Sequence, residues 1–171
     1  NFVEVSDVGA GGTIRFGTAN MEHGSAHAYF PSNSSLGGDV WLNNSVSSNL
    51  DSSNGSYGFL TLIHEIGHTL GLKHPGNYNA GGGGSPGPYL YPELDNYQYS
   101  VMSYNRHPGS YANPQTPMLY DIAAIQHLYG TNHNTRAGNT KYAWDANQAF
   151  VQTIWDGGGI DIIDASNERH H

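Results

Sequence analysis

The sequence predicts an α+β fold in which short strands come first, two helices follow, and the beginning of a parallel β-roll comes last. Alternating apolar and polar residues fill the first third of the 171 residues, as expected of strands. Two later stretches, 56–70 and 116–130, have the apolar spacing of helices. A glycine- and aspartate-rich segment near residue 160 is typical of a calcium-binding β-roll turn.

Four short strands are expected before the first helix. They are the alternating segments at 2–5, 13–17, 25–31 and 39–43. A turn at Gly9–Gly12 separates the first two. Pro31 has no amide hydrogen to give to a neighbouring strand, so we expect the segment before it at the edge of a sheet. The polar stretch 45–55 is expected to be a loop.

The first helix is predicted over Ser56–Leu70. Its apolar face is expected to consist of Phe59, Leu60, Leu62, Ile63, Ile66 and Leu70. The second helix is expected to start with Thr116 as N-cap and Pro117 in its first turn, and to end at Gly130. The irregular stretch 76–99 lies between them, and so long a loop in a compact domain is usually functional.

The stretch IHEIGHTLGLKHP carries the pattern H-E-x-x-H-x-x-G-x-x-H. His64 and His68 are four residues apart, so they lie on one face of a helix and can bind one metal ion. Gly71 can take the left-handed conformation that ends a helix, which lets His74 return as a third ligand. Three protein nitrogens and an open position predict a catalytic zinc site, with Glu65 at its edge as general base.

A bare H-E-x-x-H could also be two histidines on a helix surface, but the full pattern fixes five positions. Composition limits the other functions. A net charge of −8 with only six Lys plus Arg argues against nucleic acid as a partner. No apolar run approaches the ~20 residues that cross a bilayer, so no membrane partner is expected. Without cysteines, disulfides contribute nothing to stability, and the many acidic groups suit calcium.

Further downstream, SVMSY at 100–104 resembles the Met-turn that underlies the zinc of metzincin proteases. The chain as a whole resembles a serralysin, a bacterial metzincin that joins a zinc protease domain to a calcium β-roll. The matching segments are HEIGHTLGLKHPGNYNAG at 64–81, SVMSYN at 100–105, DIAAIQHLYG at 121–130 and WDGGGIDIID at 155–164. The resemblance implies a twisted mixed β-sheet, an active-site helix and a helix in the C-terminal subdomain.

The resemblance also implies an organisation and a function. Residues 1–134 would form the zinc-protease domain, with its N-terminal part missing, and 135–167 would start the β-roll; 168–171 look like a tag. The implied protein is a secreted, extracellular bacterial endopeptidase, a monomer that cleaves proteins or peptides with Zn²⁺ and Ca²⁺ as cofactors. Two alternatives stay open. One is a matrixin-like metallopeptidase, which AHAYFPSNSSLGGD at 26–39 favours, and the other is a truncated metal-binding module without activity.

Two residues of the Met-turn take roles from the resemblance. Tyr104 is implied as a further zinc ligand that moves aside for substrate and then donates a hydrogen bond to the oxyanion, and Met102 as an apolar floor beneath the imidazoles. The predicted edge strand would pair with an extended substrate through Ala26, His27, Ala28 and Tyr29. An edge strand that is merely blunted by Pro31 is the alternative.

The family pattern implies calcium ligands in two loops. The first loop would supply Arg136, Gly138 and Thr140, and the second would supply Asp156, Gly158, Gly159 and Asp161. A plain surface turn is the alternative for the second loop. Four other histidines fit no ligand spacing and are expected to be structural or at the surface: His23, His107, His127 and His133.

Overall fold

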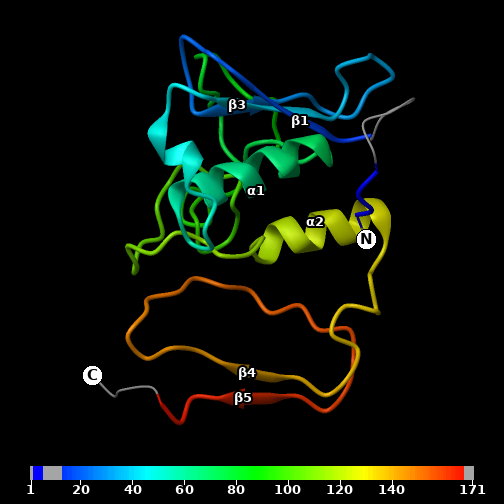
Figure 1. Ribbon diagram of the computed structural model, residues 1–171, viewed down its shortest axis with the longest axis vertical. Helices are drawn as coiled ribbons and strands as arrows, with labels where there is room; N and C mark the ends of the chain where they lie inside the picture. Colours follow the sequence, from blue (N-terminus) through cyan, green and yellow to red (C-terminus); the bar gives the residue numbers. More distant parts are fainter. Residues whose placement is uncertain (1, 6–12, 168–171) are drawn as a thin grey trace.

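A computed structural model of the chain describes residues 2–5 and 13–167. The predicted turn at Gly9–Gly12 and the tag-like residues 168–171 lie outside this part of the chain. Along the long axis of the molecule come a small β-sheet, helix α1, helix α2 and a pair of C-terminal strands (Figure 1). The mixed α+β character predicted from the sequence is confirmed. Within the described ranges, no helix has the length and apolarity needed to cross a bilayer.

The N-terminal sheet consists of β1 (Arg15–Ala19), β2 (Ala26–Ala28) and β3 (Asp39–Asn43). The central strand is β3, which pairs in parallel with β1 and antiparallel with β2, so the sheet is mixed. The Arg15 guanidinium donates to the Asp39 carboxylate at 2.7 and 2.8 Å, and this pair joins the first residues of β1 and β3. In this sheet β2 lies at an edge, as predicted.

Two strand predictions need correction. No strand forms at 2–5, where Phe2, Val3 and Val5 are 72%, 79% and 57% exposed. Alternation shows only that a segment could bury one face, whereas a strand also needs a neighbour to pair with. The strand predicted at 13–17 starts two residues later, because Arg15 is the first residue in register with β3.

Helix α1 (Tyr57–Thr69) forms where predicted and is one residue shorter at each end, because Ser56 and Leu70 are its caps. The Ser56 hydroxyl accepts the amide hydrogen of Phe59 at 3.0 Å and caps the first turn, and Gly71 has a φ of 95° just after the helix. A short 3₁₀ helix, η1 (Ser47–Leu50), occupies part of the predicted loop before α1. The buried face differs from the predicted apolar face, of which only Leu60 is fully buried. Polar residues are buried instead: Thr61, His64, Glu65, His68 and Thr69.

Helix α2 (Leu119–Tyr129) starts later than predicted. Its N-cap is Met118, whose amide donates to the buried carboxylate of Asp121 at 2.8 Å. Thr116 does not cap the helix because its hydroxyl instead accepts the amide hydrogen of Thr153 at 2.9 Å. The predicted end at Gly130 is confirmed.

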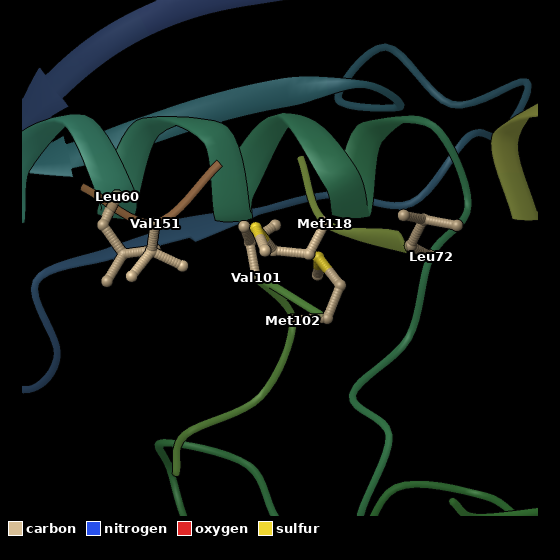
Figure 2. Packing of buried hydrophobic residues seen from close by; sticks show 6 residues of the cluster. All are labelled: Leu60, Leu72, Val101, Met102, Met118 and Val151. Carbon is tan, nitrogen blue, oxygen red and sulfur yellow. The ribbon is translucent and has the colours of Figure 1, made fainter. Parts of the chain in front are cut away.

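The hydrophobic core lies beneath α1 (Figure 2). Its buried members are Leu60, Leu72, Val101, Met102, Met118 and Val151. Fully burying each such side chain contributes about 1.5–3 kcal/mol. Val151 comes from the C-terminal segment, and its carbonyl accepts the amide hydrogen of Gln115 at 2.9 Å. The core therefore includes residues on both sides of the predicted boundary between 134 and 135.

Beyond the core, β4 (Lys141–Ala143) and β5 (Ile162–Asp164) form a parallel pair. The two strands lie at the end of the molecule opposite the N-terminal sheet (Figure 1). Parallel pairing between strands about twenty residues apart agrees with the first turn of a β-roll. The β-roll itself and the domain boundary stay predictions.

Candidate metal centre and active site

Three histidine side chains, two from α1 and one from the loop after it, lie close together. Helix α1 presents His64 and His68 one turn apart, and the chain turns after Gly71 to bring back His74. The Nε2 atom of His74 lies 3.2 Å from that of His64 and 3.1 Å from that of His68. All three rings are buried, with at most 9% of each residue exposed. The structure thus assembles the predicted trio into one group that could hold a metal ion.

The hydrogen-bond partners of the three rings fix their tautomers. Each Nδ1 faces a backbone carbonyl oxygen: Val101 for His64 (2.8 Å), Leu72 for His68 (2.7 Å) and Tyr78 for His74 (2.9 Å). A carbonyl oxygen only accepts hydrogen bonds, so each Nδ1 must carry the hydrogen. Each Nε2 therefore offers a lone pair to the centre of the group, as metal-ligating histidines do.

This arrangement fits zinc. Burial lowers the pKa of His64 to about 3 and that of His68 to about 4, and it also lowers the pKa of His74. The rings are then neutral at pH 7, and three lone pairs that face one another cannot form hydrogen bonds among themselves. Nitrogens at ~2.05 Å from a tetrahedral zinc would be roughly 3.3 Å apart, close to the spacing seen here.

Glu65 lies beside this centre and is 6% exposed. Its Oε2 atom is buried and has no hydrogen-bond partner among the described residues. Burial raises the pKa of this carboxyl group to about 7. Glu65 and His64 both line a cleft of about 290 Å³. A buried carboxylate without a partner, facing a cleft, is suited to exchange a proton with something bound there.

Met102 lies under α1, at 2% exposure. A Cβ atom at Gly67 would be 2.4 Å from the Met102 sulfur, so this close approach to the helix depends on the glycine. Gly67 directly precedes His68 in the helix. The position of Met102 agrees with the predicted role as a floor beneath the histidine-bearing turn.

Tyr104 contacts the histidine group from the Met-turn. Its ring centroid lies 5.8 Å from that of His64 and 4.7 Å from that of His74. The residue is 42% exposed and lines the same cleft as Glu65. Burial, and then the nearby Glu65 carboxylate, raise the pKa of the Tyr104 phenol, so it stays protonated and can donate a hydrogen bond.

The edge strand β2 borders the cleft. Ala26 lines it together with Gly24 and Ser25. The strand is shorter than predicted and ends at Ala28, although the Tyr29 amide still donates to the Asp39 carbonyl at 2.9 Å. Of the four predicted substrate-binding residues, only Ala26 lines the cleft, and the role of all four in binding stays a prediction.

The two predicted calcium loops lie against each other. A Cβ atom at Gly159, where φ is 116°, would be 2.6 Å from the Gly138 carbonyl oxygen. The Thr140 amide donates to Asp161 Oδ1 at 2.9 Å, and the Tyr142 hydroxyl donates to Asp156. The predicted ligands are thus close in space, but the carboxylates accept hydrogen bonds from neighbouring groups of the chain.

Four residues around the site were given no role from the sequence: Tyr78, Asp95, Ser103 and Asp121. Asp121 accepts hydrogen bonds from the Ser100 hydroxyl (2.6 Å) and the Val101 amide (2.8 Å), and Val101 in turn supplies the carbonyl for His64. One signal was available for Tyr78, since a third ligand on a loop needs a nearby partner for its Nδ1. Asp95 lies in a stretch without periodicity, and nothing in the sequence singles it out.

Comparison with known proteins decides between the families. The matrixin family profile matches residues 9–80, which include α1 and all three histidines. Serralysin C of Dickeya chrysanthemi is 41% identical over 82% of the chain, and serralysin of Proteus mirabilis is 40% identical over 90%. Metallopeptidase AprA of Pseudomonas marginalis is 39% identical over 92%. The chain is a serralysin-like metzincin.

This serralysin-like metzincin spans only part of those relatives. The matched region makes up 33% of serralysin C, 36% of the Proteus protein and 39% of AprA. Membership of the metzincins implies zinc, in agreement with the histidine group. The relatives favour the serralysin interpretation over the matrixin-like alternative.

Proposed function

We propose that this chain carries the active site of a zinc-dependent endopeptidase, with His64, His68 and His74 as zinc ligands. One observation carries the proposal: three Nε2 lone pairs converge within 4.8 Å of one another, with His74 Nε2 at 3.2 and 3.1 Å from the other two and no hydrogen between them. Lone pairs that face one another in a buried site are unfavourable, and a cation at the centre would stabilise the group. The unpartnered Glu65 carboxylate then lies beside the ion and faces the cleft.

The chemistry is that of a metal-assisted hydrolysis. A zinc ion held by the three histidines would lower the pKa of a bound water to ~7 and would polarise the substrate carbonyl. Glu65 acts as general base, taking the proton from the attacking water and then delivering it to the leaving amine. Its raised pKa, about 7 when burial is the main influence, suits a group that must both accept and release a proton near neutral pH.

Two further elements act on the substrate in this proposal. The Tyr104 phenol, protonated and at the rim of the cleft, donates a hydrogen bond to the oxyanion. The free edge of β2 pairs with an extended peptide and holds the scissile bond at Glu65. The cleft borders the strand at Ala26, which supports this placement.

The test compares Glu65→Gln with the unmodified protein in casein hydrolysis, with and without a zinc chelator. We expect one zinc per chain in both proteins and a loss of roughly 10³-fold in kcat/KM for Glu65→Gln, because general-base catalysis contributes about 10²–10⁴-fold. Glu93→Gln is the matched control, since Glu93 is exposed and outside the cleft. The control should keep full activity.

Two outcomes would contradict the proposal. Full activity in Glu65→Gln would exclude Glu65 as the base. Zinc binding without any chelator-sensitive hydrolysis in the unmodified protein would favour the alternative of a metal-binding module without activity.

The remaining expectations are proposals of the same kind. We propose that residues 135–167 start a β-roll that binds calcium through the two loops at 136–140 and 156–161, after a protease domain that ends at 134. The parallel pairing of β4 with β5 supports the β-roll. We further propose that the protein acts as a monomer outside the bacterial cell on protein substrates, as the resemblance implies.

A further inference from the structure

We propose that Tyr78 is a positioning residue for Tyr104, and that Asp95 holds Tyr78 in place. The inference deepens the proposed function and rests on it, because it explains how Tyr104 is kept at the cleft. It assigns roles to two residues in the long loop between α1 and the Met-turn.

The ring of Tyr78 lies against both the histidine group and Tyr104. Its centroid is 4.7 Å from that of Tyr104, with the two planes 28° apart, and 5.5 Å from that of His74. The Tyr104 amide also donates to the Tyr78 hydroxyl at 3.3 Å. Tyr78 therefore contacts Tyr104 at two points, the ring and the backbone.

Asp95 fixes the direction of the Tyr78 hydroxyl. This carboxylate is buried, at 8% exposure, and its Oδ1 atom accepts from the Tyr78 hydroxyl at 2.7 Å and from the Ser103 hydroxyl at 2.7 Å. Because the single hydrogen of the phenol goes to Asp95, its oxygen is left to accept from the Tyr104 amide. In this series of hydrogen bonds, the Tyr104 amide donates to the Tyr78 hydroxyl, and the Tyr78 hydroxyl donates to the Asp95 carboxylate.

Gly76 packs closely against both Tyr78 and Asp95. A Cβ atom at Gly76 would be 2.2 Å from the Tyr78 ring and 2.6 Å from the Asp95 carboxylate. The Asn105 side chain also donates to the Asp95 carbonyl at 2.8 Å, so the residues on both sides of Tyr104 are tied to Asp95. Tyr104, by contrast, is 42% exposed, and its own side chain has room to turn towards solvent. The stack on Tyr78 keeps it over the cleft.

The test removes only the hydroxyl, with Tyr78→Phe. We expect kcat for casein to fall about tenfold, KM to change less than about twofold, and zinc content and affinity to stay unchanged, since the ring and the His74 contact remain. Asp95→Asn should lower kcat in the same direction. The matched control is Tyr89→Phe, from the same loop, whose hydroxyl donates to the Ser85 carbonyl at 2.6 Å and touches neither Tyr104 nor the histidines.

A double-mutant cycle separates positioning from a general effect on stability. If Tyr78 acts through Tyr104, adding Tyr78→Phe to Tyr104→Phe should cause no further loss, because the group being positioned is already gone. A further tenfold loss in that background would overturn the inference, as would weakened zinc binding in Tyr78→Phe. If the unmodified protein shows no hydrolysis, or hydrolysis that the chelator does not affect, the proposed function fails and this inference fails with it. If the inference alone is wrong, the unmodified protein still shows chelator-sensitive hydrolysis, so the two failures are distinguishable.

Discussion

The histidine group and the calcium loops differ in how far the chain has prepared them for a metal ion. At the histidine group, every Nδ1 hydrogen is donated to a carbonyl and every Nε2 lone pair is directed inward, all from buried residues. At the calcium loops, Thr140 and Asp161 are both exposed or half-buried and bonded to each other. The fold thus orients the metal-binding atoms of the histidine group. At the calcium loops the predicted ligands are close together, but they form hydrogen bonds with other groups of the protein.

The difference follows from the ligands. Imidazole has one nitrogen that binds metal and another that can be anchored, so a protein can fix its orientation before the ion arrives. Carboxylates and carbonyls bind calcium in flexible geometries, and without the ion the carboxylates here accept hydrogen bonds from the Thr140 amide and the Tyr142 hydroxyl. We therefore expect changes that disturb the anchoring of the histidines to have large effects, and changes at the calcium loops to have small ones.

The largest effect is expected from Asp121→Ala. The Asp121 carboxylate, 3% exposed, accepts hydrogen bonds from Ser100, Val101 and Met118, and the substitution would leave these buried donors without an acceptor. We expect the free energy of unfolding in urea to fall by about 3 kcal/mol. Zinc affinity should fall about 10–100-fold, since Val101 also orients His64.

The matched change at the other site is Asp161→Ala. Asp161 accepts one hydrogen bond, from the Thr140 amide, and is exposed. In calcium-free buffer, the free energy of unfolding of Asp161→Ala should differ from that of the unmodified protein by less than about 0.5 kcal/mol. Equal losses for the two variants would mean that the sites do not differ in the way described.

A second difference lies in the pH range over which each region affects stability. Burial lowers the pKa of His64 to about 3 and that of His68 to about 4. At a pH below the usual histidine pKa of about 6.5, the metal-free chain must therefore release protons from these rings when it folds. Their contribution to the free energy of unfolding therefore rises with pH between about 4.5 and 6.5. Glu65 opposes it, because burial raises its pKa to about 7 and its contribution falls as pH rises from about 4.5 to 7.

His64 and His68, with His74 acting in the same direction, outweigh the one glutamate, so the free energy of unfolding of the chelated protein should rise by at least about 2 kcal/mol from pH 4.5 to 6.5. Urea unfolding at several pH values measures it. His68→Gln should flatten the dependence, whereas His127→Gln, on the exposed side of α2, should leave it intact. In the C-terminal region, hydrogen bonding from Tyr142 lowers the pKa of Asp156, so its contribution is lost only at lower pH. A dependence confined below pH 4 would contradict the expectation for the histidines.

Much of the site could be predicted because its determinants are local in sequence. Helical spacing brings His64 and His68 together, and a glycine after the helix lets His74 return. The strand at 39–43 could be predicted for the same reason, since its alternating residues and flanking glycines act at short range.

The rest depends on contacts between distant segments. The residues at 2–5 have the pattern of a strand but no neighbour, and Thr116 has the chemistry of an N-cap but bonds to Thr153 instead. Asp95 accepts from Ser103 and Tyr78, 8 and 17 residues away, and Asp121 accepts from Val101, 20 residues away, so the sequence does not indicate that either residue supports the site.

The last expected effect concerns calcium. If the loops at 136–140 and 156–161 bind the ion, calcium at ten times its Kd should raise the free energy of unfolding by about 1.4 kcal/mol, because a ligand that binds only the folded state stabilises it by mass action. Thermal unfolding with and without calcium measures this rise. Since Asp161 accepts from the Thr140 amide, Asp161→Asn can keep that bond while losing the charge that attracts the ion.

Asp161→Asn should therefore match the unmodified protein in calcium-free buffer and show no rise when calcium is added. Asp145→Asn, also exposed but outside both loops, should keep the full response, and so should His68→Gln, which alters only the zinc site. A calcium response that survives in Asp161→Asn would show that the ion binds elsewhere. If His68→Gln loses the response, calcium binds at the histidine group. The histidine group and the loops at 136–140 and 156–161 would then not differ in how far the fold orients their ligands before an ion binds.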